Sequence, residues 1–264
     1  MKSILQSIWA YRYFIISSVK TNFKARFVRS KLGGLWMILH PLAQVLIYAL
    51  ILSNVLKAKL PGIDSQYAYA IYLMAGMVGW TLFVEIVGSS LDVFISNANL
   101  LKKMSFPKLT LPLIVVGNGL VNFLLLLLAM FVVFASLGHI ALGAIIWLPL
   151  LIFITLAMAV GIGLTLGIIN VFIRDVGQVM SIVLQFWFWL TPVVYTISIV
   201  PDKYHDLFFL NPMVGVIVGY HNVLVYNKAP DLGLLIYPII IGITTLALAF
   251  FLFKKANEDM ADLL

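Results

Sequence analysis

The chain reads LTLPLIVVGNGLVNFLLLLLAMFVVFASL from Leu109 to Leu137, a run without a charged side chain. An α-helix needs about 20 apolar residues to cross a bilayer, so this run is long enough to span a membrane. Composition supports the same conclusion for all 264 residues, because 63% are hydrophobic and only 10% are charged. A soluble domain has roughly 45–50% apolar and about 25% charged residues, so the sequence indicates an integral membrane protein.

Further apolar runs also have the length of a membrane span. Together with the first run they lie at about Gly33 to Val55, Tyr69 to Ile95, Leu109 to Leu137, Ala144 to Ile173, Gln178 to Tyr195 and Leu232 to Phe253. The second contains Glu85 and Asp92, and the fifth meets Pro192 before its end. We therefore predict an all-α membrane protein whose transmembrane domain, residues 33–264, has six helices.

The basic residues orient these helices. With the N-terminus in the cytoplasm, thirteen of the 17 Lys and Arg residues fall on the cytoplasmic side, as the positive-inside rule requires. They are Lys2, Arg12, Lys20, Lys24, Arg26, Arg29, Lys31, Lys102, Lys103, Lys108, Arg174, Lys254 and Lys255. An even number of spans then puts both termini in the cytoplasm. The net charge of +7 is a sign of this topology rather than of nucleic-acid binding.

Residues 1–32 form a unit before the first span. Apolar side chains recur every three or four positions between Ile4 and Phe27, and Lys20, Lys24 and Arg26 interrupt them. This pattern predicts an amphipathic helix on the cytoplasmic membrane face. It serves either as an anchor that sets the topology or as a docking element for a partner subunit.

Residues 197–231 join the last two spans on the outer side. Pro201, Asn211-Pro212 and Pro230 break this segment, and the apolar stretch from Met213 to Val225 is too short to cross. Apolar stretches of about 10 to 14 residues suit re-entrant or interfacial segments. We predict a short helical hairpin that dips back into the membrane, with an ordinary surface loop as the alternative.

The sequence lacks the motifs of several enzyme classes. No stretch fits G-x-x-x-x-G-K-[ST], so the chain has no nucleotide-binding P-loop of its own. The histidines, His40, His139, His205 and His221, lack the spacing of helical metal ligands, and cysteine is absent. His205 and Asp206 are an acid/base pair in principle, but adjacent side chains on a loop are far more often solvated. We expect no catalytic residue, no metal site and no cofactor bound by this chain.

Three polar or aromatic features lie within or beside the predicted spans. Glu85 is costly inside a membrane, so it carries a proton, lines a polar pathway, or is a buried carboxyl that a neighbouring helix hydrogen-bonds. Arg174 and Asp175 form a helix-end ion pair, or the guanidinium receives a phosphate. The run from Phe186 to Trp189 suits the interfacial belt, but four consecutive aromatic residues cover every face of a helix, so at least one ring points inward.

The cytoplasmic loop 96–108 reads SNANLLKKMSFPK. Asn97 or Asn99 can cap a brief helix that Pro107 ends, and such a transverse helix makes a rigid contact for another protein. A loop that only sets the topology would explain the lysines. It would leave exposed the apolar side chains of Leu100, Leu101, Met104 and Phe106.

These residues together resemble the transmembrane subunit of type-2 ABC exporters for polysaccharides, which move lipid-linked O-antigen, capsule or teichoic acid chains across the bacterial inner membrane. The resemblance covers essentially the whole chain. It rests on Arg26 to Pro41 (RFVRSKLGGLWMILHP), Tyr69 to Pro112 with Gly76, Trp80 and Phe106-Pro107, Asn170 to Tyr195 (NVFIRDVGQVMSIVLQFWFWLTPVVY), and Asn211-Pro212-Met213. In one place the chain departs from the pattern, because His221 follows Tyr220 where many relatives have arginine.

The resemblance implies a homodimer of six-helix subunits around a channel, with two ATPase subunits below it that bind ATP and Mg²⁺. The exported substrate would be a polyprenyl-pyrophosphate-linked polysaccharide, with O-antigen expected first. The implied coupling helix comprises Asn97, Asn99, Leu100, Leu101, Lys102, Lys103, Met104, Phe106 and Pro107. The implied pyrophosphate contacts are Arg29, Lys102, Lys103 and Arg174. The implied channel residues are Trp80, Phe83, Glu85, Trp187 and Tyr195.

Two other functions stay open from the sequence. A proton-coupled secondary transporter or a lipid-linked glycan flippase would use Glu85 as its proton carrier. A membrane-embedded glycosyl or acyl transferase is the other, although the sequence has no D-x-D motif and no evident nucleophile with its base.

Overall fold

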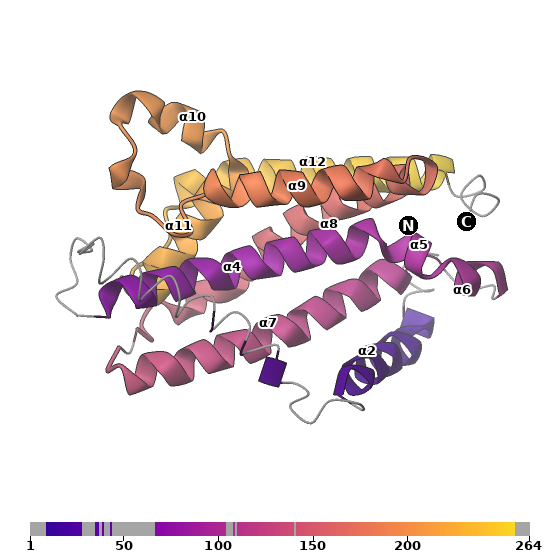
Figure 1. The fold of residues 1–264 in the computed structure, drawn as a ribbon, viewed down its shortest axis with the longest axis horizontal. Helices are drawn as coiled ribbons and strands as arrows, with labels where there is room; N and C mark the ends of the chain where they lie inside the picture. Colours follow the sequence, from indigo (N-terminus) through magenta and orange to yellow (C-terminus); the bar gives the residue numbers. More distant parts are fainter. Residues whose placement is uncertain are drawn as a thin grey trace.

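A computed structural model of the chain describes residues 9–27, 67–103, 108, 110–139 and 141–256, and between residues 27 and 67 only residues 35, 36, 39 and 43. Figure 1 shows long helices lying alongside one another, with a bent helical piece at one end and short helices at the other. The described residues form α-helices, 3-10 helices and turns, and no strand occurs among them. The predicted all-α class is confirmed.

Among the described residues, four long helices are apolar enough to cross a membrane. They are α4 (Ala68–Leu91), α7 (Thr110–Ser136), α8 (Leu148–Phe172) with the preceding η1 (Ile145–Trp147), and α12 (Leu232–Ala256). These helices match the second, third, fourth and sixth predicted spans, so the chain is a multi-pass membrane protein. The predicted first span, Gly33 to Val55, lies almost entirely outside the described residues.

The predicted fifth span is shorter than expected. Helix α9 (Asp175–Trp189) has 15 residues and therefore covers about 22 Å, less than the hydrocarbon core of a bilayer. Turns follow it before Pro192, because the residue preceding a proline is disfavoured in helical conformation. The described residues thus hold four candidate spans, or five if one bent helix pair counts as a span.

The bent pair forms the piece labelled α10 and α11 at one end of the bundle in Figure 1. After η2 (Ile197–Ile199), the helices η3 (Asp202–Tyr204) and α10 (His205–Phe209) meet α11 (Pro212–Leu224) at 103°. Asn211 caps α11 by accepting a hydrogen bond from the backbone N–H of Met213 at 3.0 Å, and Pro212 occupies the first helical turn. The break predicted at Asn211-Pro212 is confirmed.

Helices α4 and α8 form the centre of the bundle. They approach so closely that a Cβ atom added at Gly167 would lie 2.5 Å from the backbone oxygen of Ser90, and one at Gly163 would lie 2.9 Å from that of Val87. Only glycine permits this distance, which is how membrane helices commonly pack. In α4, 78% of the most apolar stretch is buried, against 22% in α12.

The C-terminal end of α4 continues as two short helices. The predicted run from Tyr69 to Ile95 breaks at Asp92, where α4 gives way to α5 (Val93–Ser96) and then α6 (Ala98–Lys103). The brief helix expected after Asn97 is therefore present. The Asn97 side chain, however, donates backward to the Val93 carbonyl at 2.8 Å and does not cap α6.

The N-terminal helix α2 (Arg12–Phe27) packs on α7, and Figure 1 shows it below that helix. A Cβ atom at Gly117 of α7 would lie 2.7 Å from the Val19 side chain. On another face, Trp9 and Tyr13 are exposed, with the Arg12 guanidinium 4.7 Å and 4.5 Å from their ring centroids. The predicted helix between Ile4 and Phe27 is thus present over its described part.

Candidate functional site

An aromatic cluster joins the middle of α4 to the C-terminal half of α9. Trp80 lies 5.6 Å from Phe188 and Phe83 lies 5.2 Å from Trp187, measured between ring centroids in edge-on geometry. This geometry is favourable for aromatic pairs because ring edges and faces carry opposite partial charge. The structure thus brings together three of the five predicted channel residues, Trp80, Phe83 and Trp187.

The aromatic run of α9 is divided between two faces of the helix. Trp187 and Phe188 face α4, whereas Phe186 and Trp189 are 68% and 55% exposed. The expectation that at least one ring points inward is confirmed. The outward rings belong to an exposed apolar face of α9 that also includes Val179, Ile182 and Val183.

Asn211 joins the C-terminal end of α9 to the start of α11. Its Oδ1 atom accepts from Nε1 of Trp187 at 2.7 Å, and its Nδ2 atom donates to Oγ1 of Thr191 at 2.9 Å and to the Leu190 carbonyl at 3.1 Å. We refer to this set of contacts as the outer clasp. The sequence predicted a turn at Asn211, but it did not predict that this side chain binds Trp187 of α9 and the residues Leu190 and Thr191 that follow α9.

Tyr195, a fourth predicted channel residue, lies outside the aromatic cluster. Its backbone carbonyl accepts from the Tyr72 hydroxyl at 3.1 Å, and its own hydroxyl donates to the Trp189 carbonyl at 3.0 Å.

His221 is 2% exposed and stacks on Tyr72 with 3.6 Å between ring centroids. Gly76 provides the room for this ring, since an added Cβ would lie 2.7 Å from Nε2 of His221.

Glu85, the fifth predicted channel residue, is half-buried and pairs with α7. The Asn122 side chain donates to its carboxylate. This contact matches the third interpretation of Glu85, a carboxyl that a neighbouring helix hydrogen-bonds. The sequence did not identify Asn122 as the partner, because nothing local relates the two residues.

The predicted pyrophosphate contacts are only partly described. Arg174 is exposed at the start of α9, and no ion pair with Asp175 is found in the described part of the chain. The predicted helix-end ion pair is therefore wrong. Both side chains are exposed, and Asp175 sits in the first turn of α9, where a negative charge is favourable without a partner. Lys102 and Lys103 end α6 without described side chains, and Arg29 lies outside the described residues.

The predicted coupling residues divide in the same way. Asn97, Asn99, Leu100 and Leu101 belong to α6 or directly precede it, and Leu101 packs on a buried cluster that includes Val93 and Phe94 of α5. This contact ties α6 to the end of the bundle. The remaining coupling residues, Met104, Phe106 and Pro107, lie outside the described residues.

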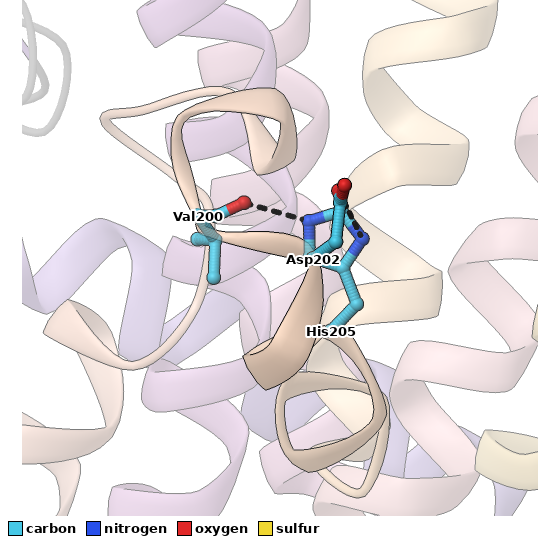
Figure 2. Close-up of polar contacts among 3 residues, drawn as sticks. All are labelled: Val200, Asp202 and His205. Carbon is cyan, nitrogen blue, oxygen red and sulfur yellow. Dashed lines mark hydrogen bonds and ion pairs between the residues drawn. The ribbon is translucent and has the colours of Figure 1, made fainter.

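On the outer piece, His205 binds groups other than the adjacent Asp206. Figure 2 shows its ring between the Val200 carbonyl, 2.8 Å from Nε2, and the Asp202 carboxylate, 3.8 Å from Nδ1. Asp202 is fully exposed, so this contact contributes little to stability. Among the described residues, no three histidine or acidic side chains come close enough to hold a metal ion.

Known proteins resemble the chain over nearly its whole length. Residues 13–225 match the family model described as ABC-2 type transporter. The O-antigen export system permease protein RfbA of Myxococcus xanthus is 29% identical over 264 residues, 99% of each chain. An RfbA protein of Klebsiella pneumoniae is 25% identical over 92% of each chain. The polysialic acid transport protein KpsM of Escherichia coli is 21% identical over 90% of this chain and 91% of its own.

Proposed function

Because the chain belongs to the ABC-2 type transporter family, we propose that it is the permease subunit of an exporter that moves a lipid-linked polysaccharide, O-antigen first among them, across the bacterial inner membrane. The observation that carries the proposal is similarity along 99% of the chain to a protein named for O-antigen export. The relative named for polysialic acid transport is less similar, which favours O-antigen over capsule.

The energy for export comes from two copies of a separate ATPase subunit, since this chain has no P-loop. In our proposal the permease is a homodimer with both termini in the cytoplasm and six spans per copy. The N-terminal helix lies at the cytoplasmic interface, and α10 with α11 form a re-entrant hairpin. The apolar composition of α11 and its 103° angle to the preceding helices support the hairpin.

The coupling element is the segment around α6. It is short and basic, and α5 connects it to α4, so a push on it reaches the most buried of the four candidate spans. ATP-driven closure of the ATPase dimer would press on α6 and tilt the helices above it. Leu101 supports this role because it anchors α6 on the apolar cluster at the base of α5.

The substrate path runs from the inner membrane surface to the outer aromatic cluster. Arg174 is exposed at the inner end of α9, where its planar guanidinium can bind phosphate oxygens in pairs. The candidate channel residues are Trp80, Phe83 and Trp187 in the aromatic cluster, and Glu85 and Tyr195 outside it. Because Phe83 is fully buried in the described chain, the helices would have to separate before the sugars could pass its ring. Aromatic faces suit this task because they offer apolar area without selecting one hydrogen-bond pattern.

The proposal is tested in cells and in vitro. Deletion of the gene should remove long-chain O-antigen from the cell surface and leave lipid-linked glycan inside, and the intact gene should restore export. The purified chain should carry an ATPase subunit with it. Normal surface glycan in the deletion strain, or a chain that binds no ATPase, would refute the proposal.

A further inference from the structure

Asn170 connects three helices with one side chain. It lies in the last turn of α8 and is 2% exposed. Its Oδ1 atom accepts from the backbone N–H of Gly177 in α9 at 3.0 Å. Its Nδ2 atom lies 3.4 Å from the Leu91 carbonyl and 3.5 Å from Oδ1 of Asp92, at the junction of α4 and α5.

Both contacts meet backbone groups that a helix end leaves without an internal partner. The N–H of Gly177 is in the first turn of α9, and the residue at the N-cap position, Arg174, makes no side-chain cap. Asn170 therefore caps α9 from the preceding helix. Leu91 is the last residue of α4, so its carbonyl is at a helix terminus as well.

The close packing of α4 and α8 holds Asn170 in place. Gly167 is one turn earlier on the same face of α8 and touches the backbone of Ser90 in α4. In contrast, α9 buries only Met180. A movement of the Leu91–Asp92 junction that reaches Asn170 would therefore shift the start of α9 more readily than the end of α8, because α8 is packed tightly on α4.

We infer that Asn170 is the positioning residue that transmits movement of α6, through α5 and the Leu91–Asp92 junction, to the inner end of α9. The inference rests on the proposed function, because it assigns α6 to the contact with the ATPase. An asparagine suits this role since its amide accepts from one helix and donates to another at the same time. Packed side chains and hydrogen bonds can carry coupling of this kind, and α6, α5, Asn170 and α9 supply such contacts.

A pair of exchanged substitutions tests the link. N170D keeps the acceptor for the N–H of Gly177 but loses the donor and sets a carboxylate against Asp92. Export per ATP hydrolysed by the permease and ATPase in proteoliposomes should fall about fivefold, the factor expected for one lost hydrogen bond. D92N alone should have a smaller effect, and N170D/D92N should recover most of the loss because donor and acceptor have exchanged places.

The matched control is Q178E, since Gln178 is exposed near the start of α9 and makes no side-chain hydrogen bond to the described residues. It should export as the wild type does. Wild-type coupling in N170D, an equal loss in Q178E, or no recovery in N170D/D92N would each overturn the inference. Absence of ATP-driven export by the wild-type complex would instead refute the proposed function.

A second measurement does not depend on the yield of export. The chain has no cysteine, so single cysteines at Asn99 on α6 and at the exposed Val179 on α9 can each carry a nitroxide label. In the wild-type background, ATP should change the mobility of both labels. In N170D it should change only the label at Asn99, and a continued response at Val179 would overturn the inference.

Discussion

Helices α4 and α9 carry facing halves of the aromatic cluster, yet the bundle holds them in opposite ways. α4 buries 78% of its most apolar stretch and contacts α7, α8 and α11 along its length. α9 fully buries only Met180 and packs on the core through half-buried side chains, Val176, Leu184, Trp187 and Phe188. The difference indicates that α4 is the fixed side of the cluster and that α9 is the side free to tilt.

The largest effect is expected where α4 is held. Leucine at Gly167 would force α8 away from the Ser90 carbonyl and should cost about 3 kcal/mol or more of the free energy of unfolding. The measurement is the thermal unfolding midpoint in detergent. Gly88→Leu is the matched control, because an added Cβ at Gly88 meets nothing within 4 Å. Equal midpoints for the two variants would contradict a fixed α4.

The next effect concerns the outer clasp. Asn211→Ala removes the cap of α11 and the contacts to Trp187, Leu190 and Thr191, so it should cost about 2 kcal/mol. It should also make the turn after α9 sensitive to limited proteolysis. Asn211→Asp retains the acceptor atoms and should lose less. Unchanged protease resistance in the alanine variant would mean that α9 is held elsewhere.

A smaller effect separates two neighbouring rings of α9. Trp187→Phe keeps the contact with Phe83 but loses the hydrogen bond to Asn211, which should cost about 1 kcal/mol. Phe186→Leu changes an exposed ring and should leave the unfolding midpoint unchanged. Chemical denaturation in detergent checks the pair. A larger loss of stability in Phe186→Leu than in Trp187→Phe would mean that Phe186, and not Trp187, faces α4.

The smallest effect is expected at Glu85. Glu85→Gln keeps an oxygen that accepts from Asn122, so the contact between α4 and α7 should persist. ATP-driven export should continue at the wild-type rate and stop when ATP is withdrawn. Loss of export in this variant, or export without ATP that follows a proton gradient, would favour the secondary transporter instead.

The elements that the sequence predicted well are those with local causes. The length of an uncharged apolar run decides whether a helix can cross the membrane, so α7, α8 and α12 matched their predicted spans. The break at Asn211-Pro212 is equally local, because asparagine caps a helix and proline suits its first turn. Trp187 faces inward because consecutive aromatic residues cannot all avoid α4.

The features that the sequence did not predict depend on distant partners. Asn170 contacts Leu91 across 79 positions of sequence, and Asn122 contacts Glu85 across 37. No periodicity within one helix identifies such a pair. The early end of α9 and the lack of an ion pair between Arg174 and Asp175 also depend on how the turns at the two ends of α9 fold. The helices were thus predictable, whereas the hydrogen bonds that position α9 were not.

The central claim is that this chain exports a glycan with force supplied by a separate ATPase. The direct test reconstitutes the chain and its ATPase in liposomes, adds lipid-linked O-antigen on the ATPase side, and follows the glycan on the opposite side. We predict that glycan crosses only when ATP and both subunits are present, and that glycan raises the rate of ATP hydrolysis. Glycan that stays on its original side under these conditions, with ATP hydrolysis unaffected by it, would contradict the claim.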